Sequence, residues 1–290
     1  MNQHQNQQYH YLEDSSEASD RTGREPYSGK TSTHRGTIVV KIGGSTFGEK
    51  ATIIRDVVNL QQQGYQPVLV HGGGKVISEW MGRQGVRPRF VRGLRVTDAT
   101  SLDIVIAVLT GVVNKGIVAS LNSLGGKAIG LSGVDGGILH ANILNPELGF
   151  VGKISRVDTA PIKAIINAGF VPVIAPVAIR EPNDVNQPLL NINADTAAGA
   201  IALSLAARHL LLLTDVEGVL DTSHRLIPRL TKRQALDLTQ SQIVGGGMLP
   251  KLEACLTASD AVEATHIVDG RAPGILIKVL SGERVGTRVG

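Results

Sequence analysis

Residues 37–44 read TIVVKIGG and residues 67–74 read PVLVHGGG, and these two stretches decide the fold class. Each is a short apolar run, rich in β-branched residues, that ends in glycines. This pattern predicts strands over Thr37–Ile42 and Pro67–His71. A helix of roughly Glu49 to Gln63 is predicted between them. A strand, a helix and a strand in this order indicate a βαβ unit with parallel strands.

The same alternation continues toward the C-terminus. Further strands are predicted over Lys127–Leu131, Val171–Ala175, Leu210–Thr214 and His266–Val268. Further helices are predicted after Gly72–Gly74, from an Asp98 N-cap to about Ser123, from Asn193 or Asp195 to about Ala207, and over Met248–Val262. The sequence therefore predicts an α/β fold, a three-layer sandwich with a mainly parallel central sheet and helices on both faces.

The first 36 residues differ from the rest of the chain. They are rich in Gln, Ser, His, Asp and Arg and nearly lack Val, Ile and Leu. Such a segment cannot bury enough apolar area to offset its ordering entropy. We therefore expect a disordered N-terminal extension over 1–36 and a folded domain over 37–290.

Composition excludes several classes of protein. Cys255 is the only cysteine, which fits a reducing compartment. The N-terminus has no apolar signal-peptide core, and Ala197–Ala207, taken as the longest apolar stretch, is too short for a bilayer. We expect a soluble cytoplasmic protein with no membrane partner. The pI of about 9.3 raises nucleic-acid binding, but scattered Lys and Arg and few aromatics argue against it.

Glycine clusters follow three predicted strands, at Gly43–Gly44, Gly72–Gly74 and Gly133–Gly137. Ligands of open α/β sheets bind at the carboxyl ends of strands. Glycines there let backbone N–H groups approach an anion, and the next helix adds its positive end. Tight turns explain many single clusters. Three clusters at equivalent places favour an anion site.

Three charged residues have both a functional and a structural interpretation. Lys41 ends an apolar strand, where it either meets an anion or extends its ammonium to solvent. Lys251 stands at a helix start, where a cation is disfavoured unless an anion lies nearby. Asp195 precedes a helix of small residues, and by itself it is best interpreted as an N-cap.

Eight stretches in one order carry a family resemblance. They are Lys41–Gly44, His71–Gly74, Gly93–Asp98, Val113–Lys115, Asn191–Asp195, Thr214–Gly218, Gly247–Lys251 and His266–Arg271. Over about residues 37–290 the chain resembles the amino acid kinase family. The motifs GLRVTD and NINAD are more specific to its acetylglutamate branch. The resemblance implies the amino acid kinase fold, with an acyl-substrate lobe over about 37–205 and a nucleotide lobe over about 206–290.

The resemblance also implies roles for individual residues. Lys41 and Lys251 would stabilise the transferring phosphoryl group, and Asp195 would hold the two lysines. Arg95 would pair with a substrate carboxylate, and Asn191 would contact the acyl amino acid. Backbone N–H groups toward phosphate and acid would come from Gly43, Gly44, Gly72 and Gly73. The nucleotide pocket would be lined by Asp215, Val216, Glu217, Gly218, Val219 and Leu220.

The implied reaction transfers the γ-phosphoryl group of ATP to the side-chain carboxylate of N-acetyl-L-glutamate, in arginine biosynthesis. Fixed cations are the main help that a protein gives to phosphoryl transfer. A carboxylate is ionised at neutral pH, so we assign no general base to His71, His140 or His266. Mg²⁺ would be held mainly by the nucleotide phosphates, with no dedicated protein metal site. A homodimer or higher homo-oligomer is expected.

Two alternatives stay open. One is a sister enzyme that acts on another acylated or carrier-linked acid of the aminoadipate or glutamate type. The other is a non-catalytic sensor that keeps the fold. Ile42, Ser45–Thr46 and Arg92 depart from the usual family pattern near the expected substrate loops, which bears on the substrate more than on the reaction type.

Overall fold

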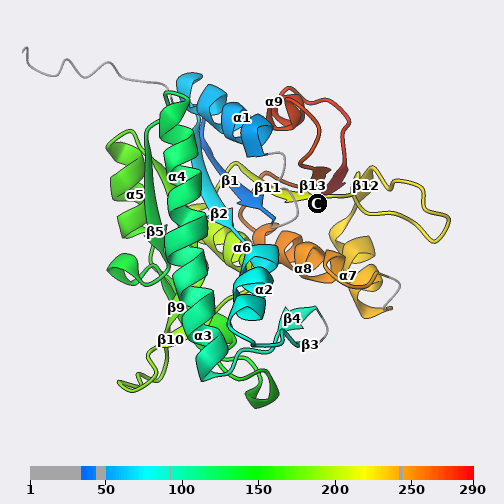
Figure 1. Ribbon diagram of the computed structural model, residues 1–290. Helices are drawn as coiled ribbons and strands as arrows, with labels where there is room; N and C mark the ends of the chain where they lie inside the picture. Colours follow the sequence, from blue (N-terminus) through cyan, green and yellow to red (C-terminus); the bar gives the residue numbers. More distant parts are fainter. Residues whose placement is uncertain (1–33, 44–49, 92, 242–243) are drawn as a thin grey trace, which may run out of the picture. The chain divides into compact units, whose positions relative to one another are not determined.

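An eight-stranded sheet organises the fold (Figure 1). The computed structural model describes residues 34–43, 50–91, 93–241 and 244–290. The expected disordered extension lies almost entirely outside these residues. The strands are β1 (Thr37–Ile42), β2 (Gln66–His71), β5 (Ala128–Ser132), β8 (Val171–Ala175), β11 (His209–Thr214), β12 (Arg229–Leu230), β13 (Ala264–Asp269) and β14 (Thr287–Val289). Their order is β12-β14-β13-β11-β1-β2-β8-β5.

All neighbours from β13 to β5 are parallel, and β14 alone pairs antiparallel with β13. Each of the six predicted strands is present in this sheet, so the mainly parallel architecture is confirmed. β12 and β14 were not predicted, because segments of two or three residues carry no usable periodicity.

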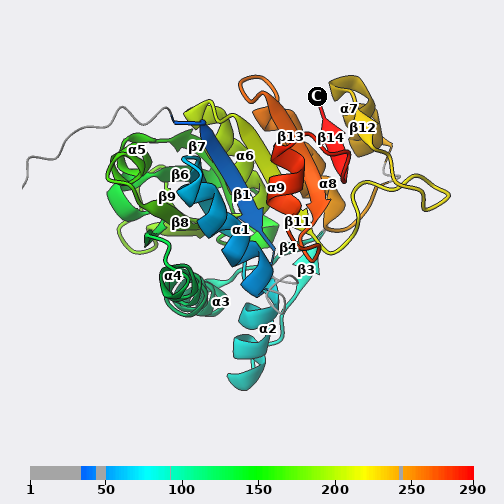
Figure 2. The same ribbon diagram turned by 90° about the horizontal axis from the view of Figure 1, so that it is seen from above.

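Helices cover both faces of the sheet (Figure 2). One face carries α1 (Lys50–Gln62), α9 (Ile275–Leu280) and a long helix made of α3 (Ala99–Ile106), the π-helical segment η2 (Ala107–Val113) and α4 (Asn114–Ser123). The other face carries α5 (Ala160–Asn167), α6 (Ala194–Leu205) and α8 (Met248–Ala258), with α7 (Lys232–Gln240) beside α8. This arrangement is the predicted three-layer sandwich.

Smaller elements surround this sandwich. A second sheet, not predicted from sequence, has the order β10-β9-β6-β7. Its strands are β6 (Leu139–Ile143), β7 (Gly152–Val157), β9 (Val177–Arg180) and β10 (Leu189–Asn191). The short helix α2 (Gly74–Arg83) follows β2, and the hairpin of β3 (Phe90–Val91) and β4 (Leu94–Arg95) comes next in the chain. Two 3₁₀ turns, Asp135–Gly137 and Pro146–Leu148, complete the described elements.

The alternation of side chains along β1 determines to which face of the sheet each residue points. Ile38 and Val40 belong to the core under α1, whereas Val39 belongs to the core under α6 and α8. Lys41 has the same parity as Val39, because successive strand residues point to opposite faces. Its side chain is therefore directed to the side of α6 and α8.

The long helix corrects one expectation about apolar stretches. Ala99–Ser123 is longer than Ala197–Ala207, and by length and composition it is apolar enough to cross a membrane. Leu102, Val105 and Val108 on it are fully buried, and Val105 and Val108 belong to the core between this helix and the sheet, so it is a core helix of this domain. The predicted Asp98 N-cap is confirmed, since its carboxylate accepts from Ser101 N–H at 2.8 Å.

Candidate active site

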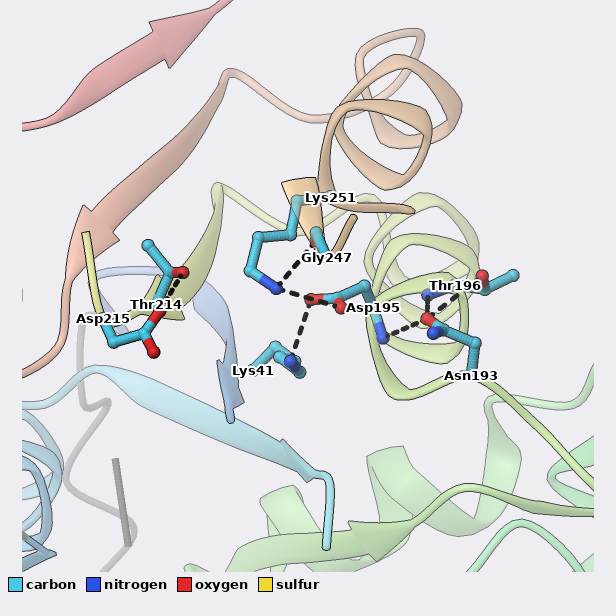
Figure 3. Close-up of polar contacts among 8 residues, drawn as sticks. All are labelled: Lys41, Asn193, Asp195, Thr196, Thr214, Asp215, Gly247 and Lys251. Carbon is cyan, nitrogen blue, oxygen red and sulfur yellow. Dashed lines mark hydrogen bonds and ion pairs between the residues drawn. The ribbon is translucent and has the colours of Figure 1, made fainter. Parts of the chain in front are cut away.

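Two lysines from different elements converge on one carboxylate (Figure 3). Lys41 at the end of β1 places its Nζ 3.0 Å from Asp195 Oδ1. Lys251 in the first turn of α8 places its Nζ 3.2 Å from Asp195 Oδ2. The structure thus brings together the three predicted catalytic residues, which are far apart in sequence.

The N-terminus of α6 explains why Asp195 is available for this contact. Asn193 is the N-cap, and its Oδ1 accepts from the N–H groups of Asp195 at 2.9 Å and Thr196 at 3.1 Å. The capping position is therefore filled by a neutral amide. Asp195 does not cap the helix, and its carboxylate is directed to the lysines instead. Of the two helix starts left open by the sequence, Asn193 is the correct one.

A glycine sets the distance between the helices that carry Asp195 and Lys251. A Cβ at Gly199 in α6 would lie 2.8 Å from the carbonyl oxygen of Ala254 in α8. Real side chains do not tolerate such a contact with backbone. Gly199 therefore allows α6 and α8 to approach closely, and this approach brings the first turns of both helices to the same point.

The lysine pair carries an excess of positive charge in a buried place. Lys41, Asp195 and Lys251 are 6%, 5% and 7% exposed, so two ammonium groups share one carboxylate away from water. Burial lowers the pKa of Lys41, and the neighbouring charge of Lys251 lowers it too, while Asp195 acts in the opposite direction. The positive ends of α6 and α8 add to the field. An anion bound here would balance the excess charge.

A cavity of about 200 Å³ lies on one side of Lys41. The four predicted acid-binding residues, Gly72, Gly73, Arg95 and Asn191, all line it. The Arg95 guanidinium is held by its surroundings. One Nη atom donates to Gly74 O and Ser78 Oγ, each at 2.8 Å, and the guanidinium carbon lies over the Phe90 ring, 4.7 Å from its centroid.

The glycine loop after β2 is only partly free for a ligand. Gly72 N–H donates to Ile42 O at 2.9 Å and so extends the β1–β2 pairing. The family resemblance implied that Gly72 and Gly73 alike would donate toward a ligand. Gly73, the N-cap residue of α2, lies one peptide further along and lines the cavity.

A second cavity, of about 650 Å³, lies on the other side of Lys41 and is also lined by Lys251. Five of the predicted nucleotide-binding residues line it: Gly43, Asp215, Val216, Gly218 and Leu220. Val219 is instead fully buried in the core, and Glu217 is exposed outside the lining. Gly44 lies outside the described residues.

Both cavities have lining residues that the sequence analysis missed. Phe90, Leu109 and Asn193 line the smaller cavity, and Asp221, His224, Val244 and Met248 line the larger one. Two of these lie within recognised motifs, Asn193 in Asn191–Asp195 and Met248 in Gly247–Lys251. The others come from elements whose contacts are tertiary.

The arrangement suits transfer of an anionic group between two ligands. Lys41 lines both cavities, so its ammonium stands where two bound molecules would meet. Two fixed cations at such a point can neutralise charge that builds up during phosphoryl transfer. Both oxygens of Asp195 already face lysines, which makes it a poor metal ligand. Among the described residues no cluster of three or more His, Cys, Asp or Glu could hold a metal ion.

Comparisons with known proteins identify the family of this chain. The chain is 43% identical to an acetylglutamate kinase of Synechococcus sp. over 262 residues, covering 87% of this chain and 86% of the relative. It is 44% identical to an acetylglutamate kinase of Cereibacter sphaeroides, covering 86% of each chain. N-acetylglutamate synthase from Neisseria gonorrhoeae, solved with coenzyme A and N-acetylglutamate, superposes with a TM-score of 0.75 at 26% identity, covering 89% of this chain and 60% of the synthase. The model of the amino acid kinase family matches residues 36–269, and the chain belongs to that family.

Proposed function

We propose that this protein transfers the γ-phosphoryl group of ATP to the side-chain carboxylate of N-acetyl-L-glutamate, giving N-acetyl-L-glutamyl 5-phosphate and ADP in arginine biosynthesis. The observation that carries the proposal is the Lys41–Asp195–Lys251 cluster between two cavities. Relatives at 43–44% identity over most of the chain support the choice of substrate.

In the proposed reaction a carboxylate oxygen of the acid forms a bond to the γ-phosphorus, and the bond from that phosphorus to the β–γ bridging oxygen breaks. The attacking carboxylate is already ionised at neutral pH, so no protein base removes a proton. Lys41 contacts the transferring group from β1, and Lys251 contacts it from α8. Asp195 keeps the two ammonium groups apart and correctly placed when no phosphate is bound.

The smaller cavity would hold the acid. Arg95 is proposed to pair with its α-carboxylate, because a planar guanidinium can bind both oxygens at once. The contacts of Arg95 to Gly74 O and Ser78 Oγ hold the guanidinium in place before the substrate arrives. Asn191, whose Nδ2 donates to Thr97 Oγ1 at 3.2 Å, is proposed to contact the acyl amino acid with its remaining polar groups.

The larger cavity would hold ATP. Mg²⁺ is proposed to enter with the nucleotide and to be held by phosphate oxygens, where it would neutralise charge on the leaving group. The lining residues support two lobes, because the smaller cavity is lined mainly by residues before 205 and the larger one mainly by residues after 206. Among the described residues of the first lobe, Lys41 and Gly43 reach the second cavity.

We also propose a cytoplasmic homodimer. The long helix exposes Ala107, Gly111 and Val112, the last of them by 44%, beside the edge strand β5. An apolar helix face beside a sheet edge favours burial against a second copy. Light scattering should give the mass of a dimer for the wild type and of a monomer for Val112→Glu. A monomeric wild type would remove this part of the proposal.

The reaction is tested by ADP release with Mg-ATP, comparing N-acetyl-L-glutamate with glutamate, aspartate, carbamate and UMP. Hydroxylamine traps an acyl phosphate as a hydroxamate and so identifies the acceptor. We expect a trapped product from N-acetyl-L-glutamate alone, and its loss in Lys41→Ala and Lys251→Ala. Turnover of another acid in preference would reassign the substrate, and turnover of none would favour a carrier-linked acid or a sensor.

A further inference from the structure

A buried polar pair lies behind the glycine loop of the acid cavity. His71, the last residue of β2, and Asn114, the first residue of α4, are both fully buried. Leu69 faces the long helix, and His71 has the same parity along β2. The imidazole is thereby directed away from the lysine cluster and toward Asn114. The proposed reaction uses neither side chain directly.

The π-helical segment η2 brings Asn114 to this position. Val108 and Leu109 face the sheet, and the next inward pair is Val113 and Asn114, five positions further along instead of the usual 3.6 per turn. One extra residue in the turn rotates the following helix face. Val112, which a regular helix would turn inward, is exposed instead.

Main-chain carbonyls fix the orientation of the Asn114 amide. Its Nδ2 lies 2.9 Å from Val173 O and 3.1 Å from Leu131 O. Carbonyl oxygens only accept, so the NH₂ group and not the amide oxygen must face them. The same Nδ2 lies 3.1 Å from His71 Nε2, so one of its two hydrogens is shared between acceptors. His71 Nε2 is then an acceptor, and the ring proton of the neutral imidazole is on Nδ1.

The carbonyl oxygen of Gly72 is an acceptor for that proton. His71 Nδ1 lies 3.1 Å from Gly72 O and donates to it. In a trans peptide the C=O and N–H bonds point in opposite directions, so fixing Gly72 O also fixes the direction of Gly73 N–H. Gly73 lines the acid cavity, and a Cβ there would lie 2.8 Å from Leu109 Cδ2. The loop is therefore held by the imidazole and by the long helix.

We propose that His71 is a positioning residue, set in its Nδ1–H tautomer by Asn114, which aims Gly73 N–H at the acid substrate. This inference rests on the proposed function for the identity of the acid. The tautomer itself does not depend on that function. Asn114 acts on the loop only through His71, and His71 acts on the substrate only through the Gly72–Gly73 peptide.

The first test reads the tautomer directly in the substrate-free protein. Long-range ¹H–¹⁵N spectra distinguish a protonated from an unprotonated ring nitrogen, and the His71 signals among eight histidines are those lost in His71→Asn. We expect a protonated Nδ1 and an unprotonated Nε2. A proton on Nε2, or on both nitrogens at neutral pH, would overturn the proposal.

The second test compares two amides at the same position. In His71→Asn the side-chain NH₂ can replace Nδ1–H toward Gly72 O, whereas in His71→Gln the amide reaches only the Nε2 position and leaves Gly72 O without this donor. We expect kcat/KM for the acid to fall about 10- to 100-fold in His71→Gln, the effect of losing one hydrogen bond to a charged substrate, and clearly less in His71→Asn. The KM for Mg-ATP should stay the same in both.

Equal losses in the two variants, or a larger loss in His71→Asn, would mean that His71 only fills space, and the proposal would be rejected. Both variants remove the same buried ring, so melting curves select a temperature at which both are folded. If the wild type does not turn over N-acetyl-L-glutamate, the proposed function fails, and the tautomer spectra still decide whether His71 holds the loop as described.

Discussion

Replacing Asp195 by Asn removes the carboxylate that lies between the ammonium groups of Lys41 and Lys251 while keeping the shape of the side chain. At separations of 3.0 and 3.2 Å each lysine gains a gross attraction of about 5 kcal/mol at an effective dielectric constant of ~20. Desolvation offsets much of this gain, and removing one partner of a buried ion pair costs about 3–5 kcal/mol. For a domain of this size the melting temperature should fall by about 6–20 °C.

The pH dependence of this loss has a defined sign. Burial already puts the pKa of Lys41 below its ordinary value, and Asp195 is the influence that raises it, so Asp195→Asn lowers this pKa further. At pH values between the folded-state pKa of Lys41 and about 10.5, this lysine is protonated in the unfolded chain but not in the folded chain, and stability rises with pH over that range. The difference in melting temperature between wild type and variant should therefore shrink from about pH 7 to about pH 9.

The assay is differential scanning fluorimetry at both pH values, together with ADP release at neutral pH. Turnover should fall about 10²-fold or more, because both phosphate-binding cations lose their fixed position. Asp260→Asn is the matched control, since Asp260 pairs with Lys232 at 2.9 Å on the surface, where such a pair contributes at most about 1 kcal/mol. A deficit in melting temperature that does not change with pH, or near-normal turnover, would refute the electrostatic account of Asp195.

Three further predictions concern other parts of the molecule. Arg95→Lys keeps the charge but loses the planar guanidinium, so in steady-state kinetics the KM for N-acetyl-L-glutamate should rise about 10-fold or more with little change in the KM for ATP. An unchanged KM for the acid would remove Arg95 from the site. Gly199→Ala should lower the free energy of unfolding in urea by about 1–3 kcal/mol, because the added Cβ would lie 2.8 Å from Ala254 O. The control Gly82→Ala, at a position with open space around it, should be neutral or stabilising, and equal effects of the two substitutions would contradict the close packing of α6 and α8. Burial, with smaller effects from His209 and Arg288, lowers the pKa of His266 to about 4, so on acidification the unfolded chain binds this proton before the folded chain does, and stability falls as the pH drops from about 6.5 to about 4. His266→Gln should make this fall in melting temperature shallower, and an identical pH profile would show that His266 does not titrate on unfolding.

The sequence by itself predicted six strands of the central sheet and their mainly parallel arrangement. Strands such as Thr37–Ile42 and Val171–Ala175 are largely apolar, which is typical of strands buried on both faces of a sheet. The three glycine clusters after strands also favoured an anion site, whereas Lys41 and Lys251 kept a structural interpretation beside the functional one until the family resemblance assigned their roles. These signals are local, so they can be recognised before any contact is known.

The tertiary structure decided between residues that local sequence signals do not distinguish. Asn193 and Asp195 are both good N-caps by type, and only the approach of Lys41 and Lys251 determines which of them is the ion-pair partner. The segment Asp215–Leu220 was predicted as a unit, yet Val219 enters the core while its neighbour Gly218 lines the cavity, because packing and not sequence position selects the face.

The second sheet was missed because its strands are short, and β6 pairs with β9, a partner distant in sequence. The β3–β4 hairpin was missed because its two strands have two residues each, too few to show a period. The π-helical segment was missed for a related reason. Ile104–Val113 has the composition of an ordinary apolar helix, and the extra residue in one turn is stabilised only by what it brings together, Asn114 with His71 and Leu109 with Gly73. Residue types determined the chemistry that this chain can perform, and the contacts between distant segments decided where in the molecule that chemistry is placed.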